Sequence, residues 1–539
     1  MRVGARSLRD RGTPPSSESF RTGWLILVSC LAVSLVVAAM AALNTALPDI
    51  AKSVGADTGE MTWIIDGYTL VLAALLLPAG AIGDRLGRKP VLIAGLIVFG
   101  VASLAAVWVD TSLQLIITRF VAGAGAALIM PSTLSLISAG VPRERRPLAI
   151  SIWAGVAGAG AIMGFFVTGV LLEFFSWHSV FVTFAASSAA TLILVLTIGN
   201  SKDAAPGSFD VIGSATSVIA IAAVVFGLLE APQRGWTDPL ILVCLIGGVV
   251  LVAVFILVEK HRTSPLLDVR LFTNRAFSAG SLSVALQFLA SFGVFYLLLL
   301  QLQLVYGYSA LTSALALFPM VVGVGVFAMI GNWVAVRFHS LRIVLGAGIA
   351  IAAAGVLAIG IVDADVYWKL GIMLGVCAVG IGLATAPSTT AIMSNTPLDN
   401  QGIGSAVNDT ARELGAAIGI ALAGSILAAG YADRIGPTVD VTRDQLTAVD
   451  PSLADRAADA VSSSLAGAVE VVDALPADAA PLGEQITAGA HAAFLEPLQS
   501  ACLVLGSILM AGALFLAWYS PREVIPADGK PDDPEPTAG

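Results

Sequence analysis

The sequence predicts an all-α polytopic membrane protein with fourteen transmembrane helices. Hydrophobic residues make up 57% of the 539 positions and charged residues only 12%, which leaves too little polar surface to coat a soluble body of this length. A bilayer core of about 30 Å needs about 20 apolar residues of helix. Fourteen charge-poor apolar runs of about that length or longer follow one another along the chain, so a soluble fold is excluded.

The runs and the polar segments between them place the helices. The predicted spans are 24–48, 61–82, 90–108, 113–141, 148–172, 177–198, 211–231, 239–258, 276–304, 309–336, 343–362, 369–391, 403–430 and 493–518. Because their number is even, both termini are expected on the same side of the membrane. Most of the 28 Lys and Arg residues lie in segments on that side, and the positive-inside rule therefore predicts cytoplasmic termini.

A long acidic segment, 431–492, separates the last two predicted spans. It holds ten Asp and Glu residues against three Arg and is rich in Ala, which favours a small helical hairpin or a partly disordered external cap. Two interpretations stay open: a solvated loop without a part in transport, or a lid over the outer mouth that attracts cations. The two ends of the chain, 1–23 and 519–539, are expected to be cytoplasmic tails, the second of them disordered.

A few polar or ionisable side chains interrupt the apolar spans. They are Asp66 in the second span, Arg119 in the fourth, and Asn408, Asp409, Arg412 and Glu413 in the thirteenth. A charge at the bilayer centre costs at least about 2.5 kcal/mol on insertion scales, so it is retained mainly where it faces a cavity or a partner. These residues could form ion pairs that hold helices together, or they could handle protons and substrate; the second interpretation is favoured.

The cluster in the thirteenth span is the main candidate for proton handling. Asp409 and Glu413 are four residues apart and share one helical face. Both cannot remain ionised in a low dielectric without a large free-energy cost, so at least one is expected to take up a proton near neutral pH. Arg412 is three residues from Asp409 and is expected to pair with it.

Two motifs carry a resemblance to a known family. The connection between the second and third spans contains Gly80, Asp84, Arg85, Gly87, Arg88 and Lys89, and it resembles the signature loop of the major facilitator superfamily. Arg119 with Gly123 and Gly125 resembles the fourth-helix motif of that superfamily. The fourteen spans and the end of the first span, which includes Asn44, resemble its fourteen-helix drug:proton antiporter family. The resemblance covers about residues 24–520.

The resemblance implies a major facilitator fold. It consists of a six-helix bundle at 24–198, an inserted helix pair with flanking loops at 199–275, and a second six-helix bundle at 276–518. Substrate would bind midway between the bundles, which rock so that the site opens to one side at a time. The signature loop would act as a latch on the inner gate. Gly80 permits close packing, Asp84 contacts a neighbouring helix end, and Arg85, Arg88 and Lys89 stay at the inner surface.

Two departures from the family pattern bear on proton coupling. The first span has Ala39 where the family usually has Asp. The fifth-helix motif, normally Gly-Pro followed by Gly-Gly, is degraded to Gly160, Gly164, Phe165, Thr168 and Gly169. The remaining glycines still let this helix bend and approach its neighbour, whereas the bulky Phe residues restrict how closely it can approach.

The predicted function is secondary active transport, not catalysis: export of a lipophilic drug or similar small molecule in exchange for protons. Asp66, Asp409 and Glu413 are the expected proton carriers, and no cofactor is expected because the proton gradient drives transport. The sequence has no P-loop and no metal-ligand spacing. Substrate, protons and membrane lipid are the expected partners, without nucleic acid, for a monomer in a bacterial cytoplasmic (inner) membrane. The alternatives are a dedicated exporter of an endogenous metabolite or lipid-like precursor, and a transport-inactive sensor or scaffold.

Overall fold

The computed structural model describes residues 15–56, 58–201, 209–338, 340–363, 366–447, 451–476 and 479–522. Within these ranges the chain is helical without a β-strand, and fourteen helices are long and apolar enough to cross a membrane. The predicted class, an all-α polytopic membrane protein, is therefore confirmed. Residues 1–14 and 523–539 of the two predicted tails lie outside the described ranges.

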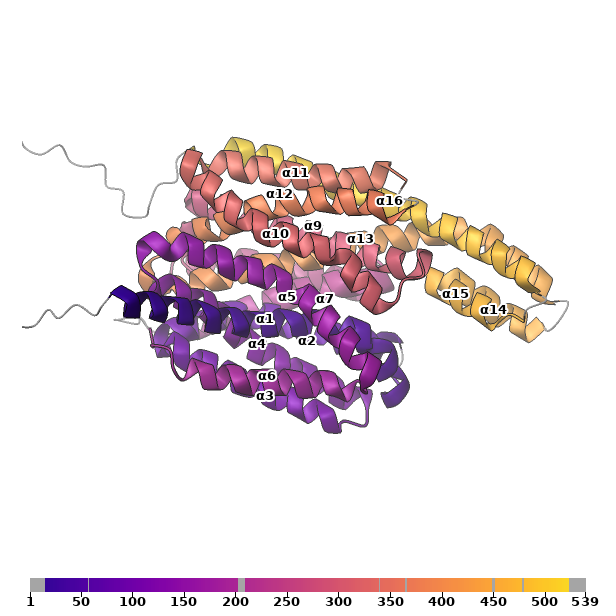
Figure 1. Ribbon diagram of the computed structural model, residues 1–539, viewed down its shortest axis with the longest axis horizontal. Helices are drawn as coiled ribbons and strands as arrows, with labels where there is room; N and C mark the ends of the chain where they lie inside the picture. The colour runs from indigo at the N-terminus through magenta and orange to yellow at the C-terminus, as the bar shows by residue number, and fades with distance from the viewer. Residues whose placement is uncertain are drawn as a thin grey trace, which may run out of the picture.

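The spanning helices run approximately along the long axis of the molecule (Figure 1). The first set is α1 (Pro15–Val54), α2 (Thr58–Leu86), α3 (Arg88–Ala105), α4 (Ser112–Gly140), α5 (Arg146–Phe174) and α6 (His178–Val195). After α7 (Val211–Arg234) and α8 (Pro239–Glu259), the second set is α9 (Arg275–Leu300), α10 (Ala310–Phe338), α11 (Leu341–Ile361), α12 (Tyr367–Ser394), α13 (Gln401–Thr447) and α16 (Ala480–Tyr519). The start of α1 and the end of α16 lie at one end of the molecule, called here the terminal end. The opposite end is called the hairpin end.

The two sets of six helices pack in the same pattern. In the first set α1 packs on α5, α2 on α4, and α3 on both α4 and α6. In the second set α9 packs on α13, α10 on α12, and α11 on both α12 and α16. The sets meet along two seams, where α2 contacts α13 and α5 contacts α10. A repeated fold with two seams of this kind permits one set to rotate against the other.

Helices α7 and α8 lie beside the two sets. α7 packs on α2 and on α13, and so covers one of the two seams, whereas α8 packs mainly on α7. At the hairpin end, Gln233 Nε2 donates a hydrogen bond to Thr62 Oγ1 of α2 (2.9 Å), and Trp236 Nε1 donates one to Ser425 Oγ of α13 (2.9 Å). The inserted pair therefore contacts both sets, which the sequence did not indicate.

The acidic segment is helical in its described part. α13 continues to Thr447 and α16 begins at Ala480, so these two helices extend well beyond the predicted spans. Between them lie α14 (Pro451–Ser463) and α15 (Leu465–Ala474), and the whole unit projects from the hairpin end (Figure 1). Buried apolar residues hold it together, and the hydroxyl of Tyr431 donates to the carbonyl of Val461 at 3.0 Å. Of the two forms expected from the sequence, the described residues adopt the helical hairpin.

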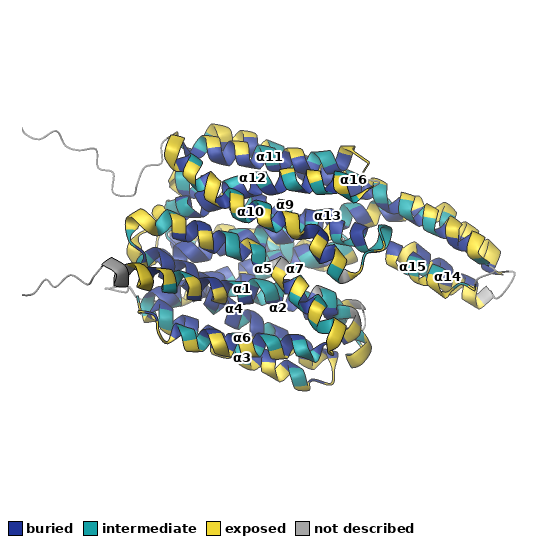
Figure 2. Cartoon of the chain, viewed as in Figure 1, coloured by how far each residue is buried: buried dark blue, intermediate teal, exposed yellow. Residues whose placement is uncertain are grey.

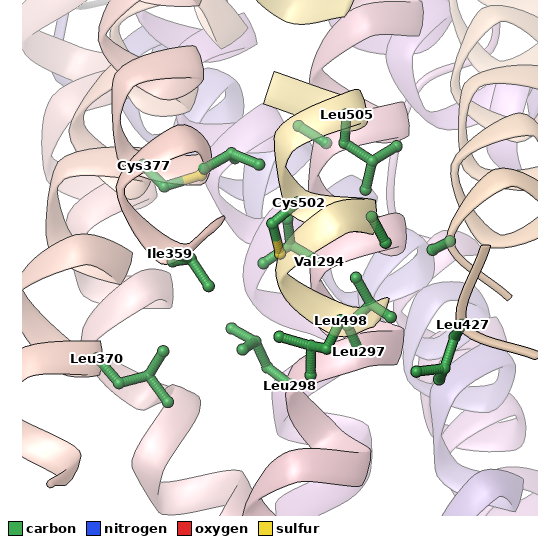
Figure 3. Packing of buried hydrophobic residues seen from close by; sticks show 14 of the residues in the cluster. Val294, Leu297, Leu298, Ile359, Leu370, Cys377, Leu427, Leu498, Cys502 and Leu505 are labelled. Carbon is green, nitrogen blue, oxygen red and sulfur yellow. The ribbon is translucent and has the colours of Figure 1, made fainter. Parts of the chain in front are cut away.

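Buried apolar side chains fill each set of helices. In the second set, Val294 of α9 lies beside Cys502 of α16, and both belong to one buried cluster with Leu298 of α9 and Cys377 of α12 (Figure 3). All four cysteines are free thiols inside spanning helices. Exposed residues recur along the helices (Figure 2), and many of them are large and apolar, such as Val243 of α8 at 68% exposure. An extended apolar surface of this kind is suited to contact with lipid.

Candidate functional site

The signature loop joins the two sets of helices at the terminal end. Asp84, near the end of α2, accepts hydrogen bonds from the backbone N–H groups of Gly402 (2.8 Å) and Ile403 (3.1 Å) at the start of α13. The carboxylate thereby satisfies two donors that a helix N-terminus leaves unpaired, and the helix dipole also favours a negative charge there. Asp84 is buried, so both bonds form away from water.

Arg88 belongs to the same buried contact. Its guanidinium donates to Asp84 Oδ1 through Nη2 (2.8 Å) and Nε (3.1 Å), and Nη2 also donates to the carbonyl of Leu398 in the second set (3.0 Å). The side chain is only 2% exposed. Arg88 was expected at the inner membrane surface; at the terminal end its side chain is buried within the protein, because the Asp84 carboxylate and the Leu398 carbonyl provide it with acceptors.

The rest of the signature loop shapes the connection. Gly87 has a φ of 107°, a conformation that a residue with a side chain adopts only with strain. Lys89 Nζ donates to the carbonyls of Leu196 (2.8 Å) and Ile198 (2.7 Å), which follow the end of α6. Arg85 and Lys89 remain partly exposed. These residues fix the turn between α2 and α3 and attach α6 to it.

The seam between α2 and α13 depends on two facing glycines. A Cβ added to Gly80 would lie 2.5 Å from the carbonyl oxygen of Gly402 and 2.8 Å from Ala406 Cβ. A Cβ added to Gly402 would overlap the carbonyl oxygen of Gly80 and lie 2.8 Å from Asp84 Cγ. Only glycine at both positions lets the two backbones approach closely enough for Asp84 to reach the start of α13.

Arg119 of α4 is buried among backbone carbonyls and one aromatic ring. Its Nε donates to the carbonyl of Ile64 (3.0 Å), its Nη2 donates to the carbonyl of Ala39 (3.3 Å), and its guanidinium carbon lies 4.3 Å from the ring centroid of Tyr68. In the described ranges it forms no ion pair within 4 Å. The resemblance noted from the sequence led us to expect an Asp at position 39; here the first span offers Arg119 only the backbone carbonyl of Ala39, and no carboxylate pairs with the guanidinium among the described residues.

The glycines of the fourth-helix motif permit the packing that positions Arg119. A Cβ on Gly123 would lie 2.5 Å from the carbonyl oxygen of Tyr68 in α2, and one on Gly125 would lie 2.6 Å from the backbone nitrogen of Phe99 in α3. α4 is thus held closely against two neighbours. The close approach of α2 brings Tyr68 over Arg119, and the Tyr68 hydroxyl donates to the carbonyl of Val36 at 3.0 Å.

The polar cluster of α13 is buried between the two sets. Asn408, Asp409, Arg412 and Glu413 are all at most 4% exposed. Asp409 Oδ1 accepts from Asn408 Nδ2 (3.1 Å). Asp409 Oδ2, Glu413 Oε2 and Arg412 Nε have no hydrogen-bond partner among the described residues. Buried polar groups are usually paired, so this cluster carries unused capacity to bind protons or polar groups.

Arg412 does not form the expected pair with Asp409. Its guanidinium carbon lies 4.8 Å from the ring centroid of Trp153 in α5 and 4.9 Å from that of Phe288 in α9. No ion pair of Arg412 within 4 Å occurs in the described part of the chain. The guanidinium therefore sits between aromatic rings from opposite sets, and the pairing expected from the i, i+3 spacing is wrong for this conformation.

Asp66 lies in the hairpin-end half of α2 and is partly exposed. Its surroundings contain a residue that the sequence interpretation missed, Glu230 of α7, which is 7% exposed and paired with Arg234 at 2.7 Å. α2 and α7 are antiparallel and are joined by the hydrogen bond between Gln233 and Thr62. Glu230 and Asp66 each lie about one helical turn from that bond, on the side away from the hairpin end. The two acids are therefore close enough for their charges to interact. The sequence signal that could have identified Glu230 is its position as a single acid near the end of the apolar run 211–231.

The fifth-helix motif serves two contacts at once. Gly160 and Gly164 face α1, where a Cβ on Gly164 would lie 2.5 Å from the carbonyl oxygen of Ala38. Gly169 faces α10. Thr168 is buried, and Phe165 is only partly exposed. The side chain of Asn44 lies outside the described part of the structure. Among the described residues, no group of three or more His, Cys, Asp or Glu side chains could hold a metal ion.

A search of family models matches the Major Facilitator Superfamily over residues 29–420. The methyl viologen resistance protein SmvA of Salmonella typhimurium LT2 is 32% identical over 510 residues, which cover 92% of this chain and 98% of that protein. The multidrug efflux pump LfrA of Mycolicibacterium smegmatis is 31% identical over 510 residues, covering 93% of this chain and 97% of that protein.

Solved structures resemble the chain in fold. The proton:xylose symporter XylE aligns with a TM-score of 0.58 and 13% identity, covering 94% of this chain and 97% of that structure. A bacterial homologue of the lysosomal transporter Spinster aligns with a TM-score of 0.56 and 15% identity, covering 94% of this chain and 98% of that structure. At these identities the likeness concerns the arrangement of the helices alone.

Proposed function

The chain belongs to the major facilitator superfamily, a family of transporters rather than enzymes, and on that premise we propose that it exports lipophilic small molecules in exchange for protons. Similar proteins carry names that describe resistance to methyl viologen or methylenomycin A and multidrug efflux. They support drug export. The positive-inside rule supports a cytoplasmic terminal end in a bacterial inner membrane.

The observation that carries the proposal is the buried cluster on α13. Asp409 and Glu413 each have one carboxylate oxygen without a partner among the described residues, in a place where the two sets of helices face one another. A carboxylate that is sealed in this conformation and reached by water in another can bind a proton on one side and release it on the other. Alternating access therefore gives the cluster a use that a purely structural role would not require.

The signature loop supports the alternation. Asp84 and Arg88 join α2 to the start of α13 at the terminal end, which keeps the sets together there. We propose that these bonds hold the cytoplasmic side closed while the other side is accessible, and that they break when the sets rotate. The division into two bundles at 24–198 and 276–518 is part of this proposal, with α7 sliding along the α2–α13 seam.

Proton coupling would use Asp409, Glu413 and Asp66, with Glu230 as a fourth acid. One proton moving down about 100 mV and one pH unit releases about 3.7 kcal/mol, enough for a gradient of several hundredfold of a neutral cargo. A monovalent cation exchanged for one proton gains only the pH part, about tenfold. Several acids along the pathway would allow more than one proton for each cationic molecule.

A second candidate is a dedicated exporter of an endogenous lipophilic compound with altered coupling. Ala39 in place of the family's Asp, with Arg119 left without a carboxylate, favours it. The two candidates differ in the breadth of cargo and in the number of protons, and both predict uphill flux.

The test is export from proteoliposomes that contain the purified chain under an imposed pH gradient. Proton-driven loss of several unrelated lipophilic dyes supports the drug exporter, whereas loss of one compound only supports the dedicated exporter. If correctly folded protein exports none of the compounds, both export functions are contradicted, and a sensor or scaffold is the remaining alternative.

A further inference from the structure

Trp153 and Phe288 come from opposite sets of helices, and both rings lie within cation–π distance of one buried charge; the space beside the two rings is called here the aromatic slot. Trp153 is fully buried, and its Nε1 donates to Thr133 Oγ1 at 3.1 Å, which fixes the indole. Phe288 stacks on Phe292 with centroids 5.8 Å apart, so the aromatic wall continues along α9. Two aromatic faces close to one charge both provide cation–π attraction. In this conformation the charge is the guanidinium of Arg412, 4.8 Å and 4.9 Å from the two ring centroids.

Arg412 is held in the slot by few other interactions. It is 2% exposed, its Nε has no hydrogen-bond partner, and it forms no ion pair within 4 Å in the described ranges. A buried guanidinium normally finds acceptors for most of its five N–H groups. One helical turn away, Asp409 Oδ2 also lacks a partner among the described residues. A better acceptor for Arg412 is therefore within reach of a side-chain rotation along the same helix face.

We infer that the aromatic slot between Trp153 and Phe288 is a binding site for lipophilic cations, and that Arg412 occupies it as a tethered competitor which cargo displaces towards Asp409. This inference deepens the proposed export function and rests on it for the class of cargo. An arriving cation takes over both aromatic faces, and Arg412 moves to the free oxygen of Asp409.

The displacement of Arg412 couples the binding of cargo to the release of a proton, and no ionisable group other than Arg412 and Asp409 is needed. If Asp409 carries a proton before the cation arrives, the approach of Arg412 stabilises the ionised carboxylate. The proton then leaves the carboxyl oxygen for water, while Arg412 keeps all of its own protons. One positive charge enters the site and one leaves, so the net charge of the buried region stays constant.

The test is equilibrium binding of tetraphenylphosphonium, a lipophilic monocation, to the full chain in lipid nanodiscs. Arg412→Gln removes the competitor and should raise the affinity for tetraphenylphosphonium about tenfold. The affinity for triphenylphosphine oxide, a neutral probe, should change less than about twofold. Adding Trp153→Leu to Arg412→Gln should abolish the gain, which separates the slot from a general electrostatic effect. Arg342→Gln is the matched control, because Arg342 donates to the carbonyls of Trp518 and Ser520 at the terminal end.

A readout on the unmodified site guards against misfolding of the Arg412 variant. Tetraphenylphosphonium should change the tryptophan emission of the wild type, and Trp153→Phe should remove that change while leaving binding within a few fold. Weaker or unchanged binding by folded Arg412→Gln, or an emission change that persists in Trp153→Phe, overturns the inference.

The binding experiments and the transport experiment can fail independently. If the binding results hold but no proton-driven export occurs in proteoliposomes, the slot stands and the proposed function fails. If export occurs but binding is insensitive to Arg412 and Trp153, the proposed function stands and the slot is overturned.

Discussion

Replacing Gly402 with Ala tests the latch at the seam between α2 and α13. The added Cβ would overlap the carbonyl oxygen of Gly80 and lie 2.8 Å from Asp84 Cγ, so the helices must separate in this conformation. Overpacking of this kind costs about 1–3 kcal/mol. Loss of one hydrogen bond to the Asp84 carboxylate adds about 1.5 kcal/mol. The closed terminal end should therefore lose about 3 kcal/mol, or a factor of about 100 in population, relative to a state in which the helices are apart.

Distances between spin labels measure this shift directly. Labels at Leu86 of α2 and Arg337 of α10, both exposed at the terminal end and in different sets, can be attached after the four native cysteines are replaced. The wild type should give mainly the short distance, and Gly402→Ala a larger fraction of a longer one. Gly375→Ala is the control, because its added Cβ meets nothing within 4 Å. Identical distance distributions for Gly402→Ala and the wild type would refute the reasoning.

Three further predictions concern the buried charges. Glu413→Gln should abolish uphill export in proteoliposomes while exchange of labelled for unlabelled cargo continues; unchanged uphill export removes Glu413 from coupling. Ala39→Asp should be tolerated only while Arg119 is present to pair with the new carboxylate. The double variant Ala39→Asp, Arg119→Gln should therefore lower the thermal midpoint by several degrees more than the sum of the two single variants. Additive changes in the thermal midpoint would show that the two sites do not interact. Glu230→Gln should lower the initial rate of pH-driven export at least about threefold, whereas Glu173→Gln, an exposed acid at the hairpin end, should not; equal rates would exclude Glu230 from the pathway.

The fold was largely predictable because its strongest determinant is local. A run of about 20 apolar residues forms a spanning helix in lipid whatever its neighbours do, so the fourteen spans could be located from composition alone. Helix ends were less predictable. α13 and α16 continue far past the predicted spans because the acidic segment has buried apolar contacts of its own and a hydrogen bond from Tyr431 to Val461, and charge alone does not reveal them.

The sequence singles out the candidate residues but not their contacts. Asp84 accepts a hydrogen bond from the start of α13, the neighbouring helix end that the signature loop led us to expect, whereas the role of the α13 cluster in proton handling stays a prediction. Arg412 turned to two aromatic rings rather than to Asp409 because Trp153 and Phe288 come from helices whose proximity no local spacing encodes. Glu230 was missed for the same reason: its position near Asp66 results from the packing of α7 on α2, and that contact is set by tertiary structure.

The most direct test of the central claim is the release of protons when cargo binds to the purified protein. The claim is that buried carboxylates between the two sets exchange a proton for a cation. In weakly buffered solution with a pH indicator, tetraphenylphosphonium should release about one proton for each cation bound. Its affinity should fall as the pH is lowered, because a proton on Asp409 competes with Arg412, which must leave the aromatic rings for that carboxylate before the cation can bind. The release should vanish in the Asp409→Asn, Glu413→Gln double variant. Stoichiometric binding without proton release, at every pH where the protein is folded, would contradict the account.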